Sequence, residues 1–168
     1  VVKFLDEQGI NHRDIKPENI LLDGNGRAVL TDFGLCGVCT NDGRKTLCGS
    51  PHYASPELCK GSQYNFTSDS WSLGVLLYTM SCASYPFEHK NVNKLINKIV
   101  AGKYDIPKKV SVDIAELIQQ LLVVDPARRL PVDKIYESSC FYKGETNLYF
   151  SEEDLQPLPA GSPIPKKD

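Results

Sequence analysis

Residues 11–34 read NHRDIKPENILLDGNGRAVLTDFG, and the rest of the chain is arranged around this stretch. Two short apolar runs, Ile20 to Leu22 and Ala28 to Leu30, flank the turn sequence DGNG. Short apolar runs on either side of a Gly-Asn turn are typical of a tight β-hairpin. The sequence therefore predicts a small rigid hairpin with polar residues at both of its ends.

Four polar residues near the ends of this hairpin suit phosphoryl transfer. Side chains alternate in direction along an extended backbone, so Asp14 and Lys16 are expected on the same side, with a proton acceptor beside a fixed cation. Asn19 and Asp32 would supply oxygen ligands of the kind that Mg²⁺ needs while it stays bound to substrate phosphates. These are the components that phosphoryl transfer requires.

The motif HRDIKPEN at 12–19, followed by DFG at 32–34, resembles the catalytic loop and the magnesium loop of protein kinases. The resemblance implies that Asp14 is the catalytic base, that Lys16 contacts the transferring phosphoryl group, and that Asn19 and Asp32 bind Mg²⁺ in a complex with ATP. In this family, a Lys two residues after the catalytic Asp is typical of serine/threonine kinases. Lys16 therefore indicates protein substrates that accept phosphate on Ser or Thr.

The resemblance also implies two further contacts near the active site. Leu21 would form the floor under the adenine ring of ATP. Glu18 occupies a position that, in related kinases, favours substrates with a basic residue before the target hydroxyl. A local hydrogen bond within the loop is an alternative role for Glu18.

Residues 35–57 are polar, rich in Gly and without periodicity, which predicts a long functional loop. Its end, TLCGSPHYASPE at 46–57, resembles the activation segment of the calcium/calmodulin-dependent and AMP-activated kinase group. The resemblance implies that an upstream kinase phosphorylates Thr46 and that Arg13 is the cationic partner of that phosphate. A solvated loop threonine is the alternative interpretation of Thr46.

Two serines in this segment have different implications. Ser50 occupies the position whose residue, in serine/threonine kinases, forms hydrogen bonds with the catalytic Asp and Lys. Ser55 stands where the family has Ala, so its hydroxyl needs a hydrogen-bond partner if the site is tightly packed.

The sequence DSWSLG at 69–74 opens a run that stays apolar on all sides as far as Met80, which predicts a helix buried in the core. It resembles the D-x-W-S-x-G helix of protein kinases, which implies that Asp69 ties back to the backbone of the catalytic loop. A plain helix N-cap is the other interpretation of Asp69. Ala83 stands where the family usually has Gly, and it lowers stability if the backbone there needs a positive φ.

Apolar residues at i, i+3, i+4, i+7 and i+8 predict two amphipathic helices, from Val92 to Val100 and from Ile114 to Leu122. The motif DPARR at 125–129 resembles the D-P-x-x-R of protein kinases, which implies a buried ion pair between Arg129 and Glu57. Pro131 suits the first turn of a last short helix that runs to Ile135.

Composition sets limits on location and partners. The chain has 168 residues, 41% of them hydrophobic, and a net charge of −2. It can therefore bury one sizeable core, and neither nucleic acid nor an anionic membrane is expected as its main partner. The longest apolar run, Leu73 to Met80, is too short to cross a bilayer, and the first residues lack the pattern of a signal peptide. A cytosolic or nuclear location is the expectation.

The six cysteines are expected to be reduced thiols in such a location. An alternative is that Cys36 and Cys39, in the spacing C-x-x-C, join Cys48 in a partial zinc or redox site. A second closely spaced pair of Cys or His residues is missing from the sequence, which argues against zinc.

The expected fold is mainly α with a small β-hairpin, the α+β C-terminal lobe of a protein kinase, over residues 1–142. Helical spacing before Gly9 indicates that the chain begins inside a helix, and no G-x-G-x-x-G or V-A-I-K motif occurs, so the N-terminal lobe is expected to be absent. Residues 143–168 are expected to form a disordered Pro-rich tail, and the acidic run 152–154 is either solvated or binds a basic partner.

The sequence thus predicts a serine/threonine protein kinase that uses ATP and Mg²⁺ to phosphorylate proteins. The 168-residue chain alone is expected to be inactive, with an apolar surface near Leu21 and Phe33 exposed. The alternative function is that of a catalytically inactive scaffold or binding module derived from a kinase.

Overall fold

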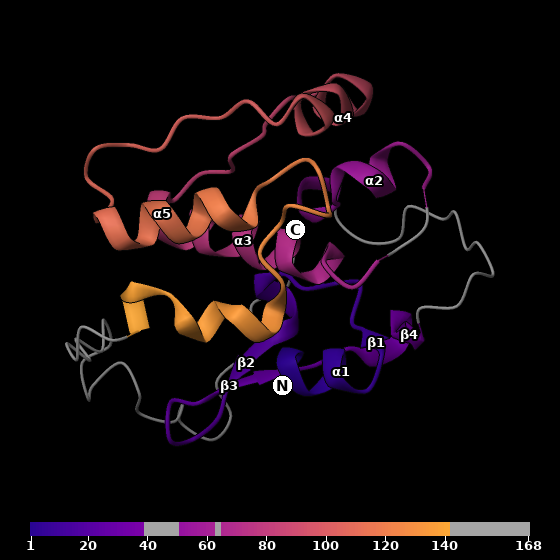
Figure 1. Cartoon of the computed structure of the whole chain (residues 1–168), viewed down its shortest axis with the longest axis vertical. Coiled ribbons are helices and arrows are strands. Elements are labelled where there is room, and N and C mark those ends of the chain that lie inside the picture. Colours follow the sequence, from indigo (N-terminus) through magenta and orange to yellow (C-terminus); the bar gives the residue numbers. More distant parts are fainter. Residues whose placement is uncertain (39–50, 63–64, 142–168) are drawn as a thin grey trace, which may run out of the picture.

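The computed structural model describes residues 1–38, 51–62 and 65–141, and the structural statements below concern these residues. Helices predominate (Figure 1). The 3₁₀-helices, which the figure does not label, are called η in the text. The elements in chain order are α1 (Val2–Glu7), β1 (Ile10–Asn11), η1 (Pro17–Asn19), β2 (Ile20–Leu22), β3 (Ala28–Leu30), η2 (Phe33–Leu35), β4 (Gly37–Val38), η3 (Pro51–Tyr53), α2 (Pro56–Cys59), α3 (Ser68–Cys82), α4 (Val92–Ala101), α5 (Val112–Leu121), η4 (Val132–Glu137) and η5 (Ser139–Phe141).

The predicted hairpin is present as the antiparallel pair β2 and β3, in which Ile20 faces Leu30 and Leu22 faces Ala28. Its turn is fixed by Asp23, whose carboxylate accepts hydrogen bonds from the backbone N–H groups of Asn25 and Arg27, each at 2.9 Å. These backbone donors, together with the Arg27 side chain, hold the pKa of Asp23 below its ordinary value. A side chain that binds its own turn in this way makes the hairpin a stiff support for the residues at its ends.

Several apolar side chains of the hairpin are open to solvent, whereas Ile20 and Leu30 are partly buried. Leu21 is 56% exposed, and Phe33, which follows the hairpin, is 47% exposed. The structure therefore confirms the prediction that apolar surface lies open near Leu21 and Phe33.

The prediction of one continuous loop over 35–57 is wrong in part. Gly37 and Val38 form β4, which pairs with Ile10 and Asn11 of β1, and η3 and the start of α2 also fall inside this range. A two-residue bridge is too short to produce an alternating apolar pattern, so it cannot be predicted from residue spacing.

Helix α3 is the centre of the core, with α5 packed along it (Figure 1). Trp71 and Val75 are fully buried, and the Trp71 ring stacks on Phe87 at 5.7 Å between centroids. The two helices approach closely at Gly74, where an added Cβ would lie 2.8 Å from the Leu121 Cβ. The prediction of a buried helix is confirmed, although Met80 near its end is 72% exposed.

The two predicted amphipathic helices are also present. Helix α4 begins after Asn91, whose side chain accepts a hydrogen bond from the Lys94 N–H, and it ends at Gly102, whose φ is 62°. Buried residues line the inner faces of α4 and α5 at Leu95, Ile99, Leu117, Ile118 and Leu121.

At the end of α3, the backbone of Ala83 has the positive φ under which this residue was expected to lower stability. This residue is the C-cap and has a left-handed backbone with φ of 55°. A Cβ in this conformation is strained, so Ala83 reduces stability relative to Gly.

The last short helix differs from the prediction. It is the 3₁₀-helix η4, it begins at Val132 and it continues past Ile135 to Glu137. Pro131 precedes it as the N-cap, with ψ of 158°, and does not lie in the first turn. The proline ring fixes only φ, so the sequence left ψ open. No helix in the described residues has the length and apolarity that a membrane crossing requires.

Candidate active site

The loop that follows β1 is anchored in the core by Ile15. Ile15 is 1% exposed and belongs to the hydrophobic core. Its neighbours Asp14 and Lys16 point the other way and form an ion pair, in which Lys16 Nζ donates to Asp14 Oδ2 at 2.6 Å. The structure thus brings the predicted proton acceptor and cation into contact, and the core anchors the loop between them.

Asn19 completes this cluster from the end of η1. Its Nδ2 donates to the Asp14 carbonyl oxygen at 2.7 Å and to Asp14 Oδ2 at 2.9 Å. Asp14 Oδ2 therefore receives two donors, while Asp14 Oδ1 accepts no hydrogen bond from the described residues. The Asn19 amide oxygen is likewise left available as an acceptor, because both contacts use its nitrogen.

Asp32 follows β3 at the other end of the hairpin. The Thr31 N–H donates to the Asn19 carbonyl oxygen at 2.8 Å, which continues the hairpin pairing and holds its two ends together. Asp32 is exposed, has a left-handed φ of 61°, and accepts a hydrogen bond from the Gly34 N–H at 3.3 Å. A non-glycine residue in this conformation is uncommon and is frequently part of a functional site.

His12 joins the two loops. Its Nε2 donates to the Thr31 carbonyl oxygen at 3.1 Å, and its Nδ1 accepts from the Asp14 N–H at 3.4 Å, so these bonds assign the Nε2-protonated tautomer. Its ring also meets the edge of Phe33, with centroids 5.1 Å apart. The segment that carries Asp32 is therefore fixed to the segment that carries Asp14.

Asp69 fixes the backbone at the start of the catalytic loop. Its carboxylate accepts hydrogen bonds from the backbone N–H groups of His12 at 2.7 Å and Arg13 at 3.0 Å. Thr67 is the N-cap of α3, so the plain N-cap interpretation of Asp69 is wrong, and the tie to the loop is the contact that forms. Burial raises the pKa of Asp69, and the two N–H donors offset only part of that effect.

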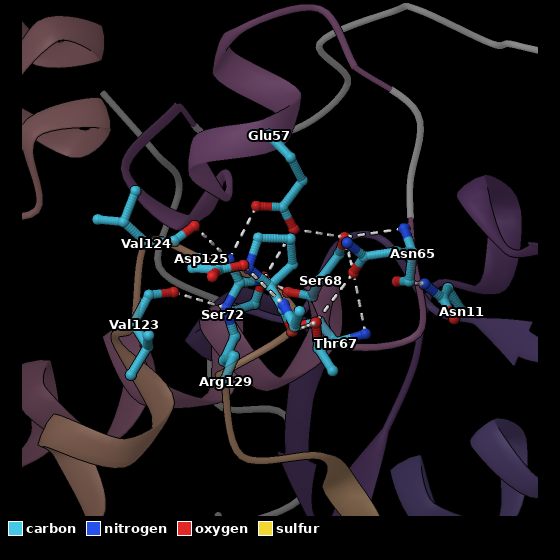
Figure 2. A network of polar contacts seen from close by, with 12 residues as sticks. Asn11, Glu57, Asn65, Thr67, Ser68, Ser72, Val123, Val124, Asp125 and Arg129 are labelled. Carbon is cyan, nitrogen blue, oxygen red and sulfur yellow. Dashed lines mark hydrogen bonds and ion pairs between the residues drawn. The ribbon is translucent and has the colours of Figure 1, made fainter.

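The ion pair predicted between Glu57 and Arg129 is present and buried (Figure 2). Arg129 Nη1 and Nη2 donate to the two oxygens of the Glu57 carboxylate, each at 2.8 Å. Burial alone would raise the pKa of Glu57, but the hydrogen bonds and charge of Arg129 outweigh it and lower that pKa. The guanidinium also lies 5.2 Å from the centroid of the Trp71 ring, a cation–π contact.

A chain of hydrogen bonds leads from this ion pair to the catalytic loop (Figure 2). Ser68 Oγ donates to Glu57 Oε1 at 2.9 Å and also contacts the side chain of Asn65. The Asn65 carbonyl oxygen accepts from Asn11 Nδ2, and Asn11 immediately precedes His12. The first turn of α3 thus links the Glu57–Arg129 pair to the loop that holds Asp14.

Sequence reasoning missed Asn11, Asn65, Ser68 and Ser72 in this network. Ser72 Oγ donates to the Tyr53 carbonyl oxygen at 2.9 Å and so fixes the end of η3. A signal was present for Ser68 and Ser72, because small polar residues in a helix that is otherwise apolar on all sides need buried partners. Asn11 and Asn65 lie outside this helix and had no such signal.

The other predicted residues lie either outside the described part of the chain or outside the hydrogen-bonded cluster of Asp14, Lys16 and Asn19. Thr46 and Ser50 lie outside the described residues, as do Cys39 and Cys48. Glu18 and Leu21 are exposed, Glu18 within η1 and Leu21 within β2. Arg13 is half-buried, with a left-handed φ of 71°.

Ser55 shows what the replacement of Ala by Ser does. Its Oγ is fully buried and makes no well-formed hydrogen bond with the described residues, although the hydroxyl lies near enough to Glu57 to help lower that carboxyl pKa. The concern about tight packing at this position is therefore justified.

The donor atoms left over at the hairpin ends fit a magnesium ion better than zinc. No group of three or more His, Cys, Asp or Glu residues within the described ranges is placed to hold a metal. The Cys36 thiol donates to the His12 carbonyl oxygen at 3.7 Å, and burial raises its pKa, so it is a poor metal ligand as it stands. The Asn19 amide oxygen and the Asp32 carboxylate are hard oxygen ligands, and a magnesium ion bound to phosphates needs only one or two protein ligands.

The fold and this site are those of a protein kinase. Residues 1–141 match the family model described as the protein kinase domain, and the chain belongs to this family. It is 40% identical to CBL-interacting protein kinase 16 of Oryza sativa subsp. japonica, over 99% of the chain and 36% of that protein. It is 42% identical to maternal embryonic leucine zipper kinase of Xenopus tropicalis, over 85% of the chain and 22% of that protein.

A third relative is an SNF1-related protein kinase. The chain is 38% identical to SNF1-related protein kinase catalytic subunit alpha KIN12 of Arabidopsis thaliana, over 94% of the chain and 32% of that protein. The chain therefore spans between 22% and 36% of the length of these three relatives. The match agrees with the resemblance to the calcium/calmodulin-dependent and AMP-activated group.

Proposed function

We propose that the protein carrying this chain is a serine/threonine protein kinase that transfers the γ-phosphoryl group of ATP to Ser or Thr of other proteins. The observation that carries the proposal is the cluster of Asp14, Lys16 and Asn19, in which both donors meet Oδ2 of the carboxylate. The names of relatives, several of them serine/threonine protein kinases, support the same reaction.

In the proposed reaction, Asp14 accepts the proton of the substrate hydroxyl through Oδ1, the oxygen that Lys16 and Asn19 leave open. The hydroxyl oxygen forms a bond to the γ-phosphorus, the bond between that phosphorus and the bridging oxygen breaks, and ADP leaves with the electron pair. Lys16 Nζ, held 2.6 Å from Asp14 Oδ2, would stabilise charge on the transferring phosphoryl group.

Asn19 and Asp32 would hold Mg²⁺, which when bound neutralises charge on the phosphates. The hairpin keeps these two residues at a fixed separation because Thr31 pairs with Asn19 across its ends. Glu18 is exposed and suits a cationic substrate residue near the target hydroxyl, which is part of the same proposal.

The test compares Asp14→Asn with Asp32→Asn in the full-length protein, with Asp133→Asn on the exposed surface of η4 as the matched control. Transfer of radiolabelled phosphate to a Ser/Thr peptide and binding of Mg-ATP are measured. Asp14→Asn should lower the rate by about 10²- to 10⁴-fold with nucleotide binding retained, because loss of a general base has this size of effect. Asp32→Asn should weaken nucleotide binding in the presence of Mg²⁺, and near-normal turnover of both variants would refute the mechanism.

Control by phosphate on Thr46 belongs to this proposal and is supported by the sequence motif. Arg13 would meet that phosphate, and the bond from its N–H to Asp69 fixes its backbone in the catalytic loop. Activity should be higher with Thr46 phosphorylated, and Arg13→Ala should remove this difference. Equal rates of the phosphorylated and unphosphorylated unmutated protein would contradict it.

A further inference from the structure

The segment from Glu88 to Val110 is strongly basic in a chain whose net charge is −2. It contains six lysines, two acidic residues and no arginine, and all six lysines are exposed. They are Lys90, Lys94, Lys98, Lys103, Lys108 and Lys109, and we call them the lysine strip. Helix α4 and the connection from it to α5 carry the strip along one edge of the molecule (Figure 1).

Within the described residues, no ion pair neutralises the charges of the strip. The ion pairs of the described residues involve Lys16, Arg27, Arg129 and Lys134, so no member of the strip takes part in one. The Nζ of Lys98 donates to the Glu88 carbonyl oxygen at 2.9 Å, which positions the ammonium group and leaves its charge in place.

Part of this arrangement is unfavourable for the helix itself, although Lys98 lies in the last turn of α4, where a cation suits the helix dipole. Lys94 lies in the first turn of α4, which has no acidic residue, and a cation there opposes the helix dipole. Lys94 and Lys98 are four residues apart, a spacing at which like charges repel. An anionic partner that binds across the strip would relieve both effects.

The strip is built on a rigid support. Leu95 and Ile99 hold α4 to the core, each no more than 1% exposed. Beyond α4, the Tyr78 hydroxyl donates to the Asp105 carbonyl oxygen at 2.8 Å, and the Tyr104 ring packs edge-on against Tyr78 and Phe87. The backbone beneath the strip, fixed in this way, loses little conformational freedom when a partner binds.

We infer that the lysine strip binds an acidic, extended polypeptide segment of a partner protein, whether or not the proposed kinase reaction is correct. Helix α4 alone is about 15 Å long, and the segment from 103 to 110 continues the strip, so its form is linear. Single ammonium groups suit single carboxylates, whereas phosphate recognition favours the forked guanidinium of Arg, which this segment lacks.

Two carboxylates argue against a membrane or a nucleic acid as the partner. Glu88 and Asp105 are exposed within the same segment and would face the continuous negative charge of a bilayer or a phosphate backbone. A peptide can place its acidic residues between them. The described part of the strip also lacks an exposed aromatic ring on which a base could stack, since Tyr104 is half-buried against the core.

The test uses the 168-residue chain and a fluorescein-labelled peptide of six Glu–Gly repeats, with a Gln–Gly peptide as the uncharged probe. The strip variant is Lys94→Gln/Lys98→Gln/Lys103→Gln. The matched variant, Lys3→Gln/Lys60→Gln/Arg128→Gln, removes the same charge from exposed residues elsewhere. Fluorescence anisotropy measures affinity, and circular dichroism checks that both variants fold.

The expected result is that the Glu–Gly peptide binds and the Gln–Gly peptide does not. The strip variant should bind the Glu–Gly peptide at least about tenfold more weakly, the matched variant within about twofold of the unmutated chain, and added salt should weaken binding. No binding of the Glu–Gly peptide, or an equal loss in the two variants, would overturn the inference. So would strip-dependent binding of phosphatidylserine vesicles or single-stranded RNA without binding of the peptide.

One further variant separates a partner from the chain's own acidic run. Glu152→Gln/Glu153→Gln/Asp154→Asn should leave affinity for the Glu–Gly peptide within about twofold. A rise of more than about tenfold would mean that the strip is occupied by carboxylates of its own chain, and the inference of a partner protein would be wrong.

Discussion

The Glu57–Arg129 ion pair gives the sharpest prediction for stability. We expect Arg129→Met to lower the free energy of unfolding by about 4 kcal/mol, because removal of one member of a buried ion pair leaves an uncompensated charge and typically costs about 3–5 kcal/mol. The burial of both side chains places this pair within that range. The Glu57 side chain is 8% exposed, and the Arg129 side chain is fully buried.

The loss is larger than that of the carboxylate contact alone. Arg129 Nη1 also donates to the Thr67 carbonyl oxygen at 2.9 Å, and Nε donates to the Val123 carbonyl oxygen at 3.0 Å. Each buried acceptor left without a donor costs about 1–3 kcal/mol. For a folded unit of this size, a loss of 4 kcal/mol corresponds to a fall in Tm of about 8–16 °C.

The assay is urea and thermal unfolding followed by circular dichroism. Lys134→Met is the matched control, since Lys134 forms an exposed ion pair with Glu137 at 2.7 Å and should contribute less than about 1 kcal/mol. The double variant Glu57→Gln/Arg129→Met should lose less than the sum of the two single variants, because it leaves no unpaired charge. Equal losses for Arg129→Met and Lys134→Met would refute the reasoning.

The pair also sets a dependence on pH. Arg129 lowers the pKa of Glu57 below its ordinary value of 4.5, so the folded chain holds this carboxylate ionised more strongly than the unfolded chain does. The resulting stability is fully present above pH 4.5 and is lost as the pH falls through the lower folded pKa. The difference between the unmutated chain and Arg129→Met should therefore shrink on acidification, and a difference that grows below pH 4.5 would contradict the assignment.

Three further substitutions test packing and backbone strain by the same unfolding measurement. Ala83→Gly should raise the free energy of unfolding by about 0.5–1 kcal/mol because φ is 55° there, and a loss would show that the left-handed conformation is not strained. Gly74→Ala should lower it by about 1–3 kcal/mol, since the new Cβ would lie 2.8 Å from the Leu121 Cβ, and a neutral result would mean that α3 and α5 are less closely packed. Ser55→Ala should raise it by about 1 kcal/mol by removing a buried hydroxyl that lacks a well-formed hydrogen bond, and destabilisation would indicate a partner beyond the described residues.

The features that the sequence predicted well are local or fall within a recognisable motif. The hairpin has two apolar runs and its own turn residues, and the amphipathic helices have a regular apolar spacing, so neither needs information from elsewhere in the chain. The buried pair of Glu57 and Arg129 is 72 residues apart in sequence, and only the family motif pointed to it. Spacing alone would not have identified Arg129 as the partner.

The features that the sequence did not predict depend on contacts between distant segments or on backbone angles. The bridge between β1 and β4 has two residues on each side, which is too few to form a pattern. The left-handed backbones of Arg13 and Asp32 also leave no trace in residue type, because neither is Gly. Arg13 is held in this conformation by the bond from its N–H to Asp69, 56 residues away.

The first turn of α3 explains why stability and catalysis are expected to be coupled in this lobe. Within it, Ser68 contacts Glu57, and Asp69 holds the backbone at His12 and Arg13. Ser68 also contacts Asn65, whose carbonyl accepts from Asn11 beside that loop. Loss of Arg129 would leave Ser68 Oγ as the one well-formed side-chain donor to the Glu57 carboxylate within the described residues. A shift of Ser68 would move the turn that carries Asp69. A substitution at Arg129 should therefore disturb the position of the catalytic loop at temperatures well below the point at which the chain unfolds.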